Sequence, residues 1–216
     1  MSSLNSYFTM NYSQPEEYRF SHDSVFLARR VFELWGPRLK PNIKVLDLCA
    51  GCGVVGLDFL SHCRAELNVL PQRCDFVEVQ KDYASHFLVN AKTFGESGIE
   101  LRFILKNYAD CQTPEFGGQY DLILCNPPYF RTHQGKLSPS AFKNRCRFFI
   151  DSDFSSLLGM ITHSLAPKGS AFLLMRELTD HGLDALNEAK AVVGSRYQLE
   201  VVEVIRGTPL VVLTEA

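Results

Sequence analysis

Short apolar runs alternate with longer helical patterns along most of this 216-residue chain. Runs with strand character occupy residues 43–48, 74–79, 101–105, 121–125 and 171–175. Strands that alternate with helices in this way form βαβ units, in which neighbouring strands are parallel. The sequence therefore predicts an α/β fold: a mostly parallel sheet with helices on both faces.

Helical patterns fill several of the intervals between these runs. They span residues 54–63, 81–95 and 153–165, and the last has Asp153 near its N-cap and Pro167 and Gly169 after its end. A further helix precedes the first strand, runs to Trp35 and takes Asp23 or Ser24 as its cap.

The last twenty residues follow a different pattern. Residues 197–205 alternate between apolar and polar side chains, and a short RGTP turn leads to the apolar run 210–214. This pattern predicts an antiparallel C-terminal hairpin at one edge of the sheet, which makes seven strands in all. Length favours one domain over residues 41–216, with residues 1–40 as an N-terminal extension and first helix packed on its core.

Composition excludes several classes of protein. Hydrophobic residues make up 46% and charged residues 21%, which is typical of a globular protein. A run of about 18 apolar residues is missing, so we expect no membrane helix, and the N-terminus lacks the pattern of a signal peptide. The seven cysteines form no repeated framework, which indicates reduced thiols and a cytoplasmic location.

Metal-ligand spacing is also missing from the sequence. Cys49 and Cys52 form one C-x-x-C pair without a second pair, and His22 and His133 have no partners at ligand spacing, so no metal site is expected. A redox role for the pair is disfavoured because a glycine motif already explains the segment.

The formal net charge of −2 argues against a protein covered in basic residues for nucleic acid. Residues 129–150, however, contain five Lys or Arg and no Asp or Glu. A charge run of this kind is usually a solvated loop. It can also be a local surface for nucleic acid.

The segment DLCAGCG, residues 47–53, follows the first predicted strand and precedes a helix. Glycines at such a turn let a ligand approach the backbone, and ligands bind at the carboxyl ends of strands in these sheets. The spacing differs from the phosphate-binding G-x-G-x-x-G, and Asp47 would repel a pyrophosphate. A positively charged ligand fits this turn better.

Two polar residues lie at the ends of the next two strands, with Glu78 ending the second strand and Asn107 just past the third. Glu78 can accept hydrogen bonds from both hydroxyls of a ribose, or it is a surface acid at a strand end. Asn107 can contact an adenine edge, or it is a simple loop asparagine.

The motifs VLDLCAGCGVVGL, Glu78 and NPPY, in this order, resemble the Rossmann-like class I S-adenosylmethionine-dependent methyltransferases from about residue 43 to residue 175. The resemblance implies that fold, and S-adenosyl-L-methionine as cofactor, with Asp47 and Gly51 near its methionine part and Glu78 on its ribose. Many relatives carry Asp where this chain has Asn107. The implied cofactor-binding set is Asp47, Cys49, Ala50, Gly51, Gly53, Glu78, Val79, Asn107, Tyr108 and Asn126.

The tetrapeptide NPPY, residues 126–129, follows the fourth predicted strand. An amino group conjugated to a ring or carbonyl is a poor nucleophile, so it must be held with its lone pair toward the methyl group. The Asn126 side-chain oxygen and the Pro127 carbonyl can accept its two N–H groups, and the prolines hold these acceptors still. Tyr129 offers a face for stacking. We therefore predict Asn126, Pro127 and Tyr129 as catalytic residues.

The N-terminal segment EEYRFSHDSVFLARRVF resembles the bacterial tRNA adenine-N6 methyltransferases that modify a valine tRNA beside its anticodon. The resemblance implies adenine N6 in tRNA as the acceptor. The basic stretch would then lie where phosphates flank a flipped base. The predicted substrate-binding residues are Asp23, Pro128, Phe130, Arg131, Lys143, Arg145 and Arg147.

Two other functions stay open. The side-chain amide of protein glutamine is served by the same tetrapeptide, although such enzymes normally carry a helical N-terminal domain and only about forty residues precede the first strand here. A methyltransferase-like binding module without catalysis is the second alternative, and Asp47, Gly51, Glu78 and Asn126 argue against it. The oligomeric state and the order of residues 1–20 do not follow from the sequence.

Overall fold

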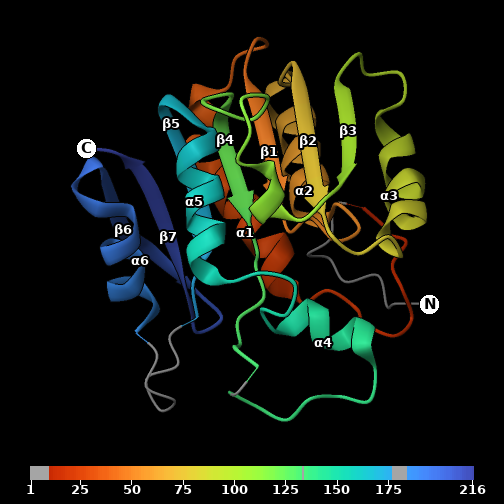
Figure 1. Ribbon diagram of the computed structural model, residues 1–216. Coiled ribbons are helices and arrows are strands. Elements are labelled where there is room, and N and C mark those ends of the chain that lie inside the picture. The colour runs from red at the N-terminus through yellow and green to blue at the C-terminus, as the bar shows by residue number, and fades with distance from the viewer. Residues whose placement is uncertain (1–9, 133, 177–183) are drawn as a thin grey trace.

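A computed structural model describes residues 10–132, 134–176 and 184–216 (Figure 1). Its seven-stranded sheet has the order β3-β2-β1-β4-β5-β7-β6. The first five strands along the chain are parallel, and β7 is antiparallel to both β5 and β6. The predicted sheet and its C-terminal hairpin are confirmed. The strands are β1 (Lys44–Leu48), β2 (Arg73–Glu78), β3 (Glu100–Leu105), β4 (Tyr120–Cys125), β5 (Leu165–Leu174), β6 (Tyr197–Ile205) and β7 (Thr208–Glu215).

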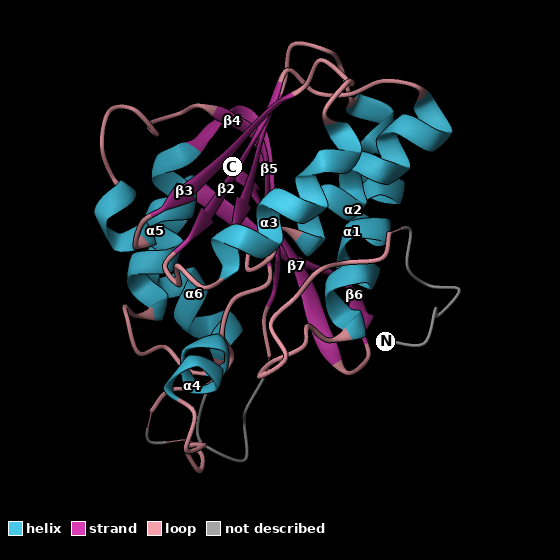
Figure 2. Ribbon diagram, turned by 90° about the vertical axis from the view of Figure 1, so that its right-hand side faces the viewer, coloured by secondary structure: helices cyan, strands magenta, loops and turns pink. Residues whose placement is uncertain are grey.

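Helices cover both faces of the sheet (Figure 2). One face carries α1 (His22–Trp35), α2 (Val54–His62) and α3 (Tyr83–Ala91), and the other carries α5 (Phe154–Ser164) and α6 (Ala185–Val193). The short helix α4 (Ala141–Arg147) lies beyond the carboxyl ends of the parallel strands (Figure 1).

The central strand β1 lies between the two hydrophobic cores, and its apolar side chains pack on both faces of the sheet. Val45 packs into the core beneath α1, α2 and α3, whereas Leu46 and Leu48 pack into the core beneath α5. All three side chains are fully buried. A strand covered on both faces has no solvent side, so its sequence does not alternate.

Several element ends differ from the sequence-based predictions. The helix predicted over residues 54–63 continues through a π-helical turn, Cys63–Leu67, and the helix predicted over 81–95 is shorter, with a 3-10 turn at Lys92–Phe94. Strand β5 begins directly after α5, so Pro167 and Gly169 lie inside this strand rather than ending the helix. The ladder shifts register between Tyr120 and Leu122, which accommodates the proline that cannot donate a hydrogen bond.

The predicted cap of α1 is wrong. The residue before the helix is Ser21, whose side chain makes no capping hydrogen bond, and Asp23 lies in the first turn instead. There the Asp23 Oδ1 atom is 3.0 Å from Arg206 Nε in the β6–β7 turn, an ion pair without the alignment of a hydrogen bond. The sequence analysis did not predict helices α4 and α6. Helix α4 lies within the basic stretch, residues 129–150, for which a solvated loop was one of two interpretations.

Candidate functional site

A cavity of about 490 Å³ opens at the carboxyl ends of β1, β2 and β4. This volume lies within the range of small-molecule sites in proteins. It brings together predicted residues from segments far apart in the sequence. Those lining it are Asp23, Cys49, Ala50, Gly51, Glu78, Val79, Asn107, Tyr108, Asn126, Pro127, Pro128, Tyr129, Phe130, Arg145 and Arg147.

The glycine turn between β1 and α2 forms one wall of this cavity. Its backbone adopts left-handed φ angles at Cys49 (62°), Gly51 (55°) and Gly53 (84°). A Cβ atom at Gly53 would meet the Phe87 ring at 2.8 Å, so only glycine fits there. Gly53 therefore shapes the turn through packing and does not line the cavity.

Asp47 lies behind the glycine turn rather than in the cavity. Its carboxylate is fully buried, and its Oδ2 atom accepts a 2.8 Å hydrogen bond from the Gly56 N–H at the start of α2. Its Oδ1 atom has no hydrogen-bond partner among the described residues. Burial raises the pKa of Asp47 well above its ordinary value. Asp47, predicted to lie near the methionine part of a cofactor, thus supports the glycine turn from behind and does not line the cavity.

Glu78, at the end of β2, has its carboxylate fixed by the backbone. Its Oε2 atom accepts a 2.8 Å hydrogen bond from Gly51 N–H, and its Oε1 atom accepts from Val79 N–H and Gln80 N–H at 2.9 and 2.8 Å. Burial raises the pKa of Glu78, and these three hydrogen bonds oppose the shift. A carboxylate has about four acceptor positions, so at least one remains for a ligand hydroxyl.

Asn107 uses both ends of its side chain within the protein. Its Oδ1 atom accepts from Ala109 N–H at 3.0 Å, which caps the 3-10 turn Tyr108–Cys111, and its Nδ2 atom donates to the Asp151 carbonyl at 2.7 Å. Asn107 lines the cavity, but the cap explains its presence without a ligand. Tyr108 lies beside it, nearly buried, and donates to the Asp153 carbonyl at 3.1 Å.

Asn126 directly follows β4, and hydrogen bonds hold both ends of its carboxamide. Its Nδ2 atom donates to Ser24 Oγ in α1 at 2.8 Å, and its Oδ1 atom accepts from the Tyr129 hydroxyl at 2.7 Å. The side chain is half-buried and lines the cavity. A carbonyl oxygen has two lone pairs, so Oδ1 keeps one for a second donor.

The chain after NPPY is held by the end of α4. Tyr129 N–H and Phe130 N–H both donate to the Arg147 carbonyl, at 3.1 and 3.0 Å, and Phe149 N–H donates to the Phe130 carbonyl at 2.8 Å. The excursion from Arg131 to Arg147 therefore leaves and returns at nearly the same point.

The residues of the basic stretch fall into different environments. Arg131 pairs with Glu188 in α6 and borders a small neighbouring pocket instead of the cavity. Arg145 forms a bidentate ion pair with Asp151 at 2.8 Å. Lys143 is half-buried and does not line the cavity. His133 lies outside the described residues.

The segment before α1 forms a further wall that sequence reasoning missed. Gln14, Tyr18 and Phe20 line the cavity. The segment is attached to the core upstream, where the Tyr12 hydroxyl donates to Asp58 at 2.7 Å and Ser13 N–H donates to Asn90 at 2.7 Å. The aromatic residues of this segment were the available signal in the sequence.

Cavity residues from other elements were also missed, among them Gln80, Tyr83 and Arg176. Tyr83 and Gln80 both approach Cys146 Sγ at 3.3 Å, which joins α3 to α4 across the cavity. Arg176, two residues after the end of β5, also lines the cavity, and a single arginine after an apolar run gave no signal.

The described residues contain no group of three or more His, Cys, Asp or Glu side chains arranged to hold a metal ion. All seven cysteines are free. Among the described helices, none has the length and apolar character needed to cross a membrane.

Comparison with known proteins places these features in a family. Residues 10–142 match the family model described as Conserved hypothetical protein 95. The chain belongs to this family. It is also 30% identical over 132 residues to a protein of Shewanella baltica (strain OS155 / ATCC BAA-1091) named tRNA1(Val) (adenine(37)-N6)-methyltransferase. That match covers 61% of this chain and 51% of the relative, so the chain spans about half the length of this curated relative.

Solved structures show the same fold. The protein yhhF from Escherichia coli is 14% identical, with a TM-score of 0.62 over 95% of this chain and 92% of that one. The Thermus thermophilus 16S rRNA methyltransferase RsmC, in complex with AdoMet and guanosine, is 16% identical, with a TM-score of 0.62 over 93% of this chain and 45% of that one. The Rossmann-like methyltransferase fold expected from the sequence is confirmed.

Proposed function

We propose that this chain is an S-adenosylmethionine-dependent N-methyltransferase that modifies the N6 amino group of adenine in tRNA. One observation carries the proposal: the Asn126 carboxamide, fixed by Ser24 and Tyr129, lines the same cavity as the strand-end acid Glu78. Glu78 ends β2 and Asn126 follows β4, so the proposed cofactor contact and the proposed acceptor contact lie on either side of the carboxyl end of β1.

The residues of the cavity fit S-adenosyl-L-methionine. Glu78 retains acceptor capacity for ribose hydroxyls, and its carboxylate is already oriented by three backbone N–H groups. Val79 and Tyr108 supply flat and apolar surface for an adenine ring, and Gly51 leaves room beside the turn. When bound, the cofactor supplies an electrophilic methyl group on a sulfonium.

Asn126 would act mainly by orientation. Its free Oδ1 lone pair can accept one N–H of the incoming amino group, and the Pro127 carbonyl can accept the other. Each such hydrogen bond contributes only about 0.5–1.5 kcal/mol net. Correct orientation of reacting groups can lower a barrier by up to about 7–11 kcal/mol. The acceptors also favour the positive charge that develops on nitrogen during transfer.

The choice of tRNA adenine rests on the relative from Shewanella baltica, whose name states that activity. The N-terminal segment supports it, because Phe20, Ser21 and Asp23 line the cavity beside Asn126. An enzyme that acts on tRNA would work in the cytoplasm.

Incubation with methyl-labelled cofactor tests the proposal. Separate reactions would contain unfractionated tRNA, rRNA or a protein release factor, followed by mass spectrometry of the labelled product. We expect label in tRNA, recovered as N6-methyladenosine. Label in release-factor glutamine would replace adenine as the acceptor, and cofactor binding without transfer to any substrate would identify a binding module.

A further inference from the structure

The arginines around the cavity differ in whether a carboxylate neutralises them. Arg145, which lines the cavity, pairs with Asp151, and Arg131, which borders the small neighbouring pocket, pairs with Glu188. Arg147 lines the cavity too, yet within the part of the chain that the structure describes it forms no ion pair. Arg176 also lines the cavity, and it forms no ion pair with any carboxylate that the structure describes.

Aromatic rings, rather than acids, hold these two guanidinium groups. Arg147 Cζ lies 5.5 Å from the centroids of the Phe130 and Phe148 rings. Arg176 Cζ lies 5.7 Å from the centroid of Phe130 and 6.0 Å from that of Tyr129. Both arginines therefore contact the same Phe130 ring, although one ends α4 and the other follows β5.

Contact with a ring fixes a guanidinium but leaves its charge intact. A cation–π contact contributes about 0.5–1 kcal/mol at an exposed site and consumes few of the five N–H donors. Those donors suit the oxygens of phosphate, which arginine binds in bidentate geometry. The three acids that line the cavity have other partners: Glu78 is bound by backbone N–H groups, Asp151 pairs with Arg145, and Asp23 pairs with Arg206.

We propose that Arg147 and Arg176 bind two backbone phosphates of the nucleic acid strand that carries the acceptor base. This inference rests on the proposed function. Both guanidinium groups contact the Phe130 ring, and Arg147, Arg176 and Phe130 all line the cavity that contains Asn126. A strand held at two phosphates would present the base between them to the Asn126 carboxamide.

Binding of unfractionated tRNA, without methyl donor, tests the pair. Dissociation constants would be measured from about 50 to about 200 mM NaCl for the wild type, Arg147→Gln, Arg176→Gln and the double variant. We expect each single variant to bind roughly tenfold more weakly at low salt. The slope of log K against log salt, which is negative, should become less steep by about 0.7–0.9. The double variant should lower the slope by about twice that amount.

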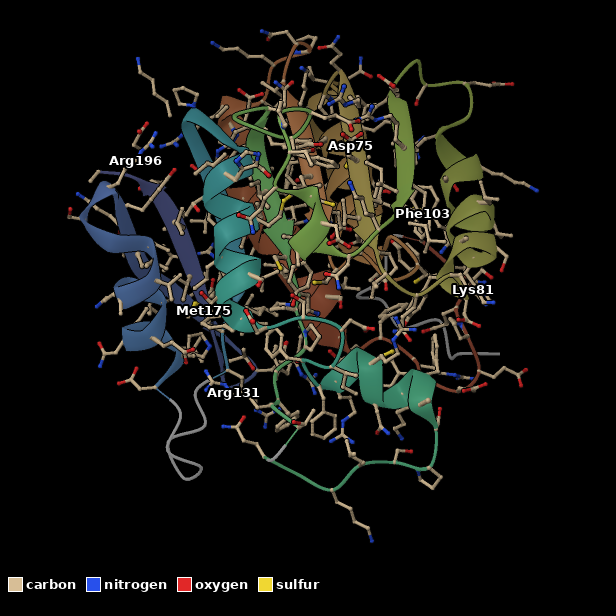
Figure 3. The ribbon with its side chains drawn as sticks, viewed as in Figure 1. Asp75, Lys81, Phe103, Arg131, Met175 and Arg196 are labelled. Atoms are coloured by element: carbon tan, nitrogen blue, oxygen red, sulfur yellow. The ribbon has the colours of Figure 1, made fainter. Side chains whose placement is uncertain are left out.

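Arg196→Gln is the matched control. Arg196 also lies over an aromatic ring, Tyr197, at 5.5 Å, and pairs with Glu215. It lies near the top of the molecule in Figure 3, whereas Met175, which precedes Arg176, lies lower down toward α4. We expect a wild-type slope for this variant. Arg145→Gln should lower the slope less than Arg147→Gln, because Asp151 already neutralises Arg145.

Unchanged slopes for Arg147→Gln and Arg176→Gln would overturn the inference, as would an equal change for Arg196→Gln. Binding of S-adenosylhomocysteine, measured by calorimetry, should stay within about twofold of wild type in every variant, which shows that each is folded. The proposed function can fail separately. If the wild-type protein binds tRNA with the expected salt slope but methylates none, the phosphate contacts stand and the proposed activity is wrong.

Discussion

The side chain of Asn126 is fixed before any substrate arrives. Ser24 accepts from its amide nitrogen and Tyr129 donates to its oxygen, so the residue does not have to reorient when an amino group enters. Preorganised acceptors of this kind are effective because they need no rearrangement during reaction.

Asn126→Ala should therefore lower kcat by at least about a hundredfold while leaving cofactor affinity within about twofold of wild type. Tyr129→Phe keeps the ring but removes the hydroxyl that holds Asn126, so a smaller fall in kcat is expected. Methylation rates and calorimetric binding of S-adenosylhomocysteine measure both effects. If Asn126→Ala lost affinity as much as turnover, Asn126 would belong to the cofactor site instead.

Glu78 predicts a pH dependence of cofactor binding. Its raised pKa means that the buried carboxylate takes up a proton at higher pH than an ordinary glutamate does. Protonation removes acceptor capacity, so the Kd for S-adenosylhomocysteine should rise as pH falls from about 8 to about 5, where an unperturbed glutamate stays largely ionised. Glu78→Gln should bind weakly with a flat profile over this range, and a pH-dependent Glu78→Gln profile would assign the effect to another group.

The stability of the ligand-free protein responds to Glu78 with the opposite sign. The folded carboxyl holds its proton more tightly than the unfolded one, so protonation of Glu78 favours folding. That contribution is present below the unfolded pKa and is lost as pH rises through the raised folded value.

At the scale of elements, the contact between β1 and α2 depends on Gly56. A Cβ atom there would lie 2.6 Å from the Phe76 ring and 3.0 Å from Asp47 Oδ2. The close approach lets Gly56 N–H donate to Asp47, which supports the glycine turn from behind.

Gly56→Ala should destabilise the protein by about 1–3 kcal/mol, because the helix must move away from β1 and weaken the Asp47 hydrogen bond. Urea denaturation measures the change. Ser155→Ala, an exposed position in α5, is the control and should stay within about 0.5 kcal/mol of wild type. A Gly56→Ala variant as stable as this control would show that the α2 contact tolerates a methyl group.

Elements with strong periodicity could be predicted from the sequence, and their ends could not. The strands were predicted correctly, and Glu78 at the end of β2 and Asn126 after β4 line one cavity. The roles of Asp23 and Asn107 depend on partners distant in sequence, Arg206 and Asp151, which no local pattern shows.

The basic stretch illustrates the same limit. Its charge was visible in the sequence, but Glu188 and Asp151 decide which of its arginines stay uncompensated, and both lie outside the stretch. Arg176, from another element altogether, enters the same mouth because β5 neighbours β4 in the sheet.

At the scale of the whole molecule, the two ends of the sheet differ: one end carries the cavity, and the other carries a buried cluster of charged residues. Figure 3 shows Asp75 toward the end opposite Met175 and Arg131. Asp75 is fully buried and accepts from Arg102 at 2.7 and 2.5 Å and from the Tyr120 hydroxyl at 2.6 Å. Arg73 lies 3.1 Å away. This cluster joins β2, β3 and β4 far from the cavity.

Asp75→Asn should lower the free energy of unfolding by about 2–4 kcal/mol, since it leaves Arg73 and Arg102 without their buried counter-charge. The lower end of that range reflects the solvent access of Arg102. Cofactor affinity should be unchanged in the folded protein. Urea denaturation measures the stability, and calorimetry measures the cofactor affinity. A large loss of affinity under conditions where the variant is folded would show that the two ends of the sheet are coupled.

The closed excursion from Arg131 to Arg147 also bears on which changes of sequence the site can tolerate. Because its two ends meet through the Phe130 and Arg147 backbone, insertions or exchanges within it need not displace the Asn126 clamp. Residues inserted between these two ends are therefore expected to alter the rim of the cavity while the hydrogen bonds of Asn126 to Ser24 and Tyr129 stay in place.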